Sequence, residues 1–255
     1  MKPSFPAEVE IIDAPGESDV VFEATGKAQA SIAEAARGAE AFEGAARVGM
    51  FSKEPAVRRS AIERVSMERP REQSVRYVWK ARDIQPGAYR TLLNMLEIGH
   101  HFSGPLESVR LVSASGHGTR LNLSGLLNTP FPARSSRLPF ELVLKPNLED
   151  SKEPLIRMEF QREIHDDELK TLEPLFLAWD SIVIRGGYLN DLTDRYPDVD
   201  IEESLSGQQT YLAAPNTVEH LFYEFIGAAA AYDALVNAAV VVHHAGRPLS
   251  SFEIE

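Results

Sequence analysis

The feature that most constrains the fold is a near-repetition inside the chain. The stretch RDIQPGAYRTLLNML begins at Arg82, and REIHDDELKTLEPLF begins at Arg162. In both stretches the apolar residues fall at helical spacing, so each predicts a helix with one apolar stripe. A strand-like run precedes each helix, SVRYVWKAR in one case and LIRMEFQRE in the other. The residues that are identical in the two stretches are Arg82 and Arg162, Ile84 and Ile164, Thr91 and Thr171, and Leu92 and Leu172.

A second strand is expected after each of these helices. The runs are ESVRLVSA from Glu107 and DSIVIRGG from Asp180, so the repeated unit reads strand, helix, strand. In the first half TRLNLSGLL from Thr119 continues as a hairpin partner, and LPFELVLKP from Leu138 suits a strand that pairs with the one at Leu155. The sequence therefore predicts a duplicated supersecondary unit.

The C-terminal half continues with further elements of both kinds. QQTYLAA is a short strand, TVEHLFYEF begins a helix capped by Asn216 or Thr217, and SSFEIE ends the chain as a strand. This gives the order strand, helix, strand, strand, helix, strand, which is that of a ferredoxin-like unit. The expected fold class is α+β with a mostly antiparallel sheet.

Three segments follow from this reading. Residues 1–70 hold a hairpin made of VEIIDAP and DVVFEA and an alanine-rich helical segment. Residues 71–145 form the first α+β repeat and residues 146–255 the second. Because the connection between the repeats is short, we expect one continuous body rather than two domains on a linker.

Composition limits the environment and the chemistry. The chain has no cysteine, which removes disulfides, thiolate nucleophiles and cysteine-bound zinc. The first residues lack the apolar core of a signal peptide, and the most apolar run, from Phe225 to Val242, contains Asp233 and Asn237. We therefore expect a soluble cytoplasmic protein without a membrane span.

The charge of the chain excludes some partners and favours others. A net charge of −12 argues against nucleic acid and anionic lipid as ligands. Residues 53–90 carry an excess of Lys and Arg, whereas residues 146–205 are strongly acidic. Opposite local charges of this kind indicate two solvated faces or a docking surface for a basic protein.

The acidic residues gather in a predicted loop that also holds two tyrosines. Aromatic residues among charges are typical of an interface. We therefore predict a non-enzymatic binding protein whose acidic face contacts a basic protein partner, as inhibitors or immunity-type proteins do. The expected contact residues are Tyr188, Asp191, Asp194, Tyr196, Asp198, Asp200, Glu202 and Glu203.

An alternative is a small-molecule-binding protein or a metal-dependent enzyme that uses a groove between the two repeats. Imidazoles bind metals well, and the turn SGHG lies near an arginine that could hold an anion. The residues expected to line this groove are His100, His101, His117 and Arg120.

No motif in the sequence predicts a cofactor, a bound metal or a catalytic residue. HDDE, from His165, suits the start of a helix better than a metal site, and the loop at Asp198 lacks the glycine of a calcium hand. A third alternative is a homo-oligomer, since a strand at SSFEIE could pair with a second copy of itself.

Overall fold

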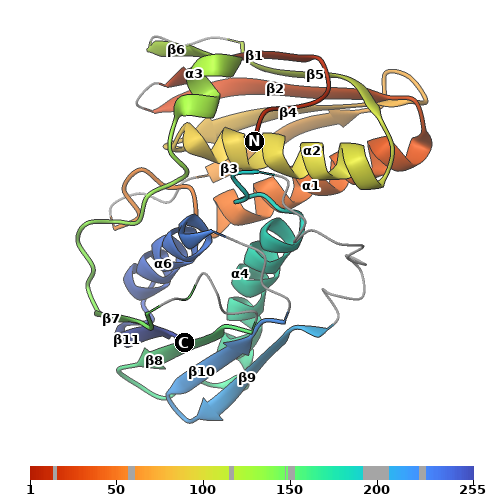
Figure 1. Ribbon diagram of the computed structural model, residues 1–255. Coiled ribbons are helices and arrows are strands. Elements are labelled where there is room, and N and C mark those ends of the chain that lie inside the picture. The colour runs from red at the N-terminus through yellow and green to blue at the C-terminus, as the bar shows by residue number, and fades with distance from the viewer. Residues whose placement is uncertain are drawn as a thin grey trace.

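The computed structural model describes residues 1–13, 16–56, 61–114, 118–146, 148, 153–191, 207–223 and 228–255. Within this part of the chain the fold is α+β, with two mixed β-sheets and helices on one face of each (Figure 1). The helices of the two sheets face one another, so the layers run sheet, helices, helices, sheet. Each sheet therefore keeps an outer face on which no described helix packs.

The first sheet belongs to the N-terminal half. Its strand order is β3-β4-β2-β5-β1-β6, and its helices are α1 (Gln29–Arg47), α2 (Gly87–Phe102) and the short α3 (Leu123–Asn128). Alternate residues of β4, among them Tyr77 and Trp79, are buried under these helices, as period-two burial requires. The strands are β1 (Ala7–Asp13), β2 (Glu17–Gly26), β3 (Ala61–Glu68), β4 (Ser74–Arg82), β5 (Leu106–Ser113) and β6 (Thr119–Asn122).

The second sheet belongs to the C-terminal half. Its strand order is β7-β11-β8-β10-β9, and it is covered by α4 (Asp166–Ile184) and α6 (Ala229–His244). The strands are β7 (Glu141–Leu144), β8 (Leu155–Phe160), β9 (Gln209–Ala214), β10 (Thr217–Leu221) and β11 (Leu249–Ile254).

Five strands of the first sheet, all except β6, are arranged like the five strands of the second. In the first, β3, β4, β2 and β5 are neighbours in that order and are all antiparallel; in the second, β9, β10, β8 and β11 are. One further strand then lies parallel to the last, β1 beside β5 and β7 beside β11. These parallel pairs make both sheets mixed rather than purely antiparallel.

Matching contacts also join the halves across the helix layers, where α1 packs against α4. The buried amide of Asn94 in α2 donates to the carbonyl oxygen of Gly187, 3.1 Å away, just after α4. The buried amide of Asn237 in α6 donates to the carbonyl oxygen of Met50, 3.3 Å away, just after α1. Since a buried amide needs a partner, each asparagine fixes the end of a helix from the other half.

Several elements differ from the sequence-based expectation in the second half. The run from Asp180, expected as a strand, is the last part of α4, and its β-branched residues are buried in the helix interface. Tertiary packing here overrides β propensity. The stretch from Thr217, expected as a helix, is β10, with Val218 and His220 buried in alternation. The helix expected to begin at Thr217 begins instead at Ala229, as α6.

Differences in the first half concern mainly the neighbours of strands. β1 and β2 form as expected but do not make a hairpin, because β5 lies between them. β7 pairs with β11 and not with β8. The strand β3 was not expected from the sequence. Residues 123–128 form a helix, because the side chain of Asn122 accepts a hydrogen bond from the amide of Gly125 and caps it. No described helix is long and apolar enough to cross a membrane.

Candidate functional site

The outer face of the second sheet is the most distinctive charged surface among the described residues. The helices α4 and α6 cover the opposite face, and the strands alternate so that every second side chain points outward (Figure 1). Five carboxylates lie on this face or at its margin against two cations, Lys145 and Arg157. We call these five the acidic sheet face: Glu141, Glu159, Glu219, Glu253 and Glu255.

Arg157 organises the centre of the acidic sheet face. It lies on β8, directly opposite Glu219 of β10 and Glu253 of β11. Its Nε is 2.9 Å from Glu219 and its Nη1 is 2.8 Å from Glu253. The hydrogen bond to Glu219 and the one to Glu253 raise the pKa of Arg157. Lys145 lies 2.7 Å from Glu255, and its hydrogen bond lowers the pKa of that carboxyl.

Apolar and aromatic side chains flank the charged centre. Val143 on β7 is 36% exposed and Tyr211 on β9 is 40% exposed, one at each edge of the sheet. The Tyr211 hydroxyl donates to Glu219 over 2.8 Å, and this hydrogen bond raises the pKa of the tyrosine. The face thus has a charged centre and one exposed apolar or aromatic side chain at each edge.

The acidic segment predicted from the sequence is described only in part. Tyr188 is buried, its hydroxyl has no hydrogen-bond partner among the described residues, and burial raises its pKa, so its ring belongs to the core. Asp191 is exposed. The remaining predicted contact residues lie outside the described residues: Asp194, Tyr196, Asp198, Asp200, Glu202 and Glu203.

The described members of the predicted groove do not come together. His100 ends α2 and packs its ring on Phe5, just before β1, while its Nδ1 accepts from the amide of Leu106. Its neighbour His101 lies 3.1 Å from the buried Glu97. Arg120 lies on β6, opposite Ile12 near the C-terminal end of β1. Ile12 is roughly 16 Å along β1 from the start of that strand, near which Phe5 and His100 lie. Arg120 is ion-paired with Glu10, and His117 lies outside the described residues.

The HDDE stretch begins α4, as the sequence predicts. His165 and Glu168 form a capping box, and Arg162 lies 2.5 Å from Glu168. The hydrogen bond from Arg162 lowers the pKa of Glu168 to about 2. These contacts account for the acidic residues as a helix start. In the described part of the chain, no three potential metal ligands gather into a cluster.

A buried hydrogen-bonded chain was missed by sequence reasoning. The Oγ1 of Thr210 lies 2.8 Å from Nδ1 of His220, whose Nε2 is 3.0 Å from Oδ1 of Asp180. The histidine and aspartate are each 1% exposed, and Phe176 stacks on the imidazole. Burial raises the pKa of Asp180, while His220 opposes that shift. No local motif marks this group because its members come from β9, β10 and α4.

Comparison with known proteins assigns no family. The chain matches no protein-family model and no curated protein.

Proposed function

We propose that this chain is a non-enzymatic binding protein that recognises a basic protein partner through the acidic sheet face. The observation that carries the proposal is the excess of outward carboxylates around Arg157, on a sheet face that no described helix covers. The net charge of −12 adds long-range attraction for a cationic partner. The acidic residues from 191 to 203 extend the same negative character along the chain.

The geometry of the face supports recognition rather than mere solubility. Because Arg157 holds Glu219 and Glu253 in fixed positions, their carboxylates do not have to be ordered when a partner binds. Arg157 and Tyr211 already donate to the two oxygens of Glu219, but a carboxylate oxygen can accept more than one hydrogen bond, so both glutamates can still accept from lysine or arginine. Val143 and Tyr211 offer apolar contacts beside them.

Charge reversal on this face tests the proposal. Glu141→Lys with Glu159→Lys should remove salt-sensitive capture of basic proteins from the native host at low ionic strength, because it makes the face positive. The matched control is Glu63→Lys with Glu107→Lys, the same change of charge in the first half of the chain. Equal capture by both double variants would exclude the acidic sheet face.

We also propose that the two halves are copies of one ferredoxin-like unit, each with one added parallel strand. The shared strand order supports this, and so does the sequence at the end of the second helix of each half. HHFSGPL follows in one half and HHAGRPL in the other, and the first histidine of each accepts from the amide of the final leucine. This duplication pairs α1 with α4 and α2 with α6, unlike the repeat of residues 82–96 and 162–176.

The proposal retains a cytoplasmic location. A chain without cysteine suits a reducing compartment, where a partner would be met without disulfide bonds on either side of the interface.

A further inference from the structure

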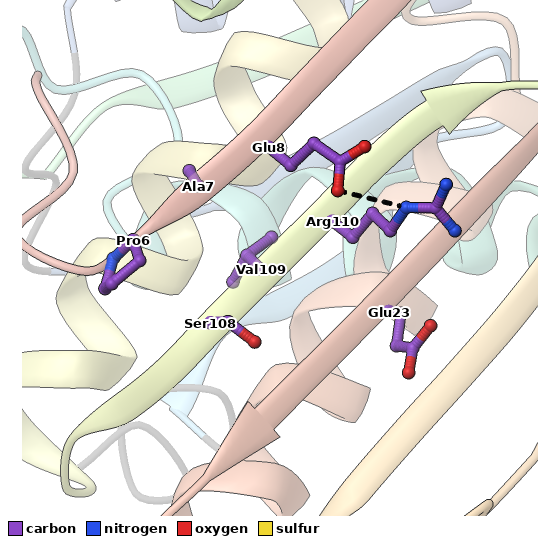
Figure 2. Close-up of a pocket in the computed structure, with 7 residues that line it drawn as sticks. All are labelled: Pro6, Ala7, Glu8, Glu23, Ser108, Val109 and Arg110. Atoms are coloured by element: carbon purple, nitrogen blue, oxygen red, sulfur yellow. Dashed lines mark hydrogen bonds and ion pairs between the residues drawn. The ribbon is translucent and has the colours of Figure 1, made fainter.

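A hollow lies on the outer face of the first sheet, on the opposite side of the molecule from the acidic sheet face. It opens where β1, β5 and β2 run side by side (Figure 2). Glu8, Arg110 and Glu23 project from these three strands toward the same side. The remaining lining comes from Ser108 and from the apolar residues Pro6, Ala7 and Val109.

The register of the strands creates an alternating row of charges through the hollow. Arg110 lies directly opposite Glu8 of β1 and directly opposite Glu23 of β2. On its other side Glu23 faces Arg76 of β4, which faces Glu68 of β3. The row thus places one carboxylate between two arginines.

Both arginines pair with the glutamates at the margins of the row. The Nε of Arg110 donates to Glu8 over 3.2 Å (Figure 2). Arg76 lies 3.6 Å from Glu68. Among the described residues, no side chain pairs with the carboxylate of Glu23, and none accepts from Nη1 or Nη2 of Arg110. The carboxylate of Glu23 and the two donor atoms Nη1 and Nη2 of Arg110 are therefore uncommitted in the same hollow.

Charge decides which ligand fits. A simple anion attracted to Arg110 would lie beside the carboxylates of Glu8 and Glu23, and a simple cation attracted to Glu23 would lie beside two guanidinium groups. Like charges at this distance disfavour both. A molecule that carries both charges meets an opposite charge at each end.

We propose that this hollow binds a small zwitterion with a carboxylate and an ammonium group, in the chemical class of free α-amino acids. The carboxylate accepts from the Nη atoms of Arg110, a geometry for which the guanidinium fork is suited. The ammonium group donates to Glu23. Opposed residues on neighbouring strands are about 5 Å apart, so one small molecule spans both groups. A short side chain then contacts Pro6 at the rim of the hollow.

This inference does not depend on the proposed protein partner, since the hollow and the acidic sheet face are on different sheets. A negative result for the zwitterion site would therefore not contradict the proposed protein partner, and the reverse also holds. The probe is L-alanine, and acetate and methylammonium at the same ionic strength serve as single-charge controls.

The experiment is an NMR titration of the full chain with each probe. Alanine should give saturable shifts at residues 6–8, 23 and 108–110, while acetate and methylammonium should not saturate. Glu23→Gln and Arg110→Gln should each weaken alanine binding at least tenfold, whereas Glu63→Gln, on the same face of the sheet two rows away, should leave it unchanged.

Three results would overturn the inference: no saturable shift in the hollow, an alanine affinity equal to that of the wild-type chain in both hollow variants, or saturation by acetate alone. The last of these would make the hollow a plain anion site. The comparison of the three probes uses the wild-type chain, so it decides the matter even where a variant does not fold.

Discussion

At the scale of single residues, the buried polar groups are the part of the protein that sequence patterns reveal least. Asp180, His220 and Thr210 are far apart along the chain, and only the fold brings them together. Tyr188 shows the converse, because its place in an acidic segment suggested exposure and its side chain is buried. Local composition predicts charge, but burial depends on which elements pack against a residue.

Replacement of His220 by phenylalanine should destabilise the protein by about 3 kcal/mol, because Asp180 loses its hydrogen-bond partner in the core. Burial already raises the pKa of Asp180, and loss of the histidine raises it further. The protonated carboxyl is then the form compatible with folding, so the loss should be smaller at pH 4.5 than at pH 8. Urea denaturation of the wild type and the variant at both pH values measures the loss of stability. An equal loss at pH 4.5 and pH 8 would show that the charge of Asp180 does not cause it.

At the scale of elements, patterns predicted the type of most helices and strands but not their neighbours. The helices at Gly87 and Asp166 and the strands at Ser74 and Leu155 form as the periodicity indicates. Pairing of β1 with β5, and of β7 with β11, was beyond prediction because both parallel pairs join segments far apart in the chain. The end of α4 was misassigned because β-branched residues there serve a helix interface.

Close approach of helix ends leaves no room for a Cβ at one glycine of positive φ in each half. Gly49 follows α1 with φ +90°, and a Cβ there would lie 2.4 Å from the side chain of Val241 in α6. Gly186 follows α4 with φ +67°, and its Cβ would lie 2.8 Å from Ile98 in α2. The matching pair agrees with the proposed duplication.

Gly49→Ala should therefore lower the free energy of unfolding by more than its backbone strain alone would. Gly246 has nearly the same φ, +89°, with open space around its Cβ, so Gly246→Ala measures that strain by itself. We expect Gly49→Ala to lower the free energy of unfolding by ~2 kcal/mol more than the control, as judged by urea denaturation. Similar losses in the two variants would mean that the helix ends are not tightly packed.

At the scale of the whole molecule, two sheets with their helices packed together leave two outer faces of different character. Around the centre of the first, the row runs Arg110, Glu23, Arg76, whereas the corresponding row of the second runs Glu253, Arg157, Glu219. The charges are reversed at matching places. The sequence predicted an acidic contact surface in the segment from Tyr188 to Glu203, whereas the strand register places five carboxylates on the outer face of the second sheet.

The most direct test of the acidic sheet face is zero-length carbodiimide cross-linking of the protein to the partner that it captures at low salt, followed by mass spectrometry. Our account predicts that partner lysines become joined to Glu141, Glu159, Glu219 or Glu253, and that raised salt abolishes the products. Cross-links confined to the first sheet, through Glu8, Glu10 or Glu63, would contradict it.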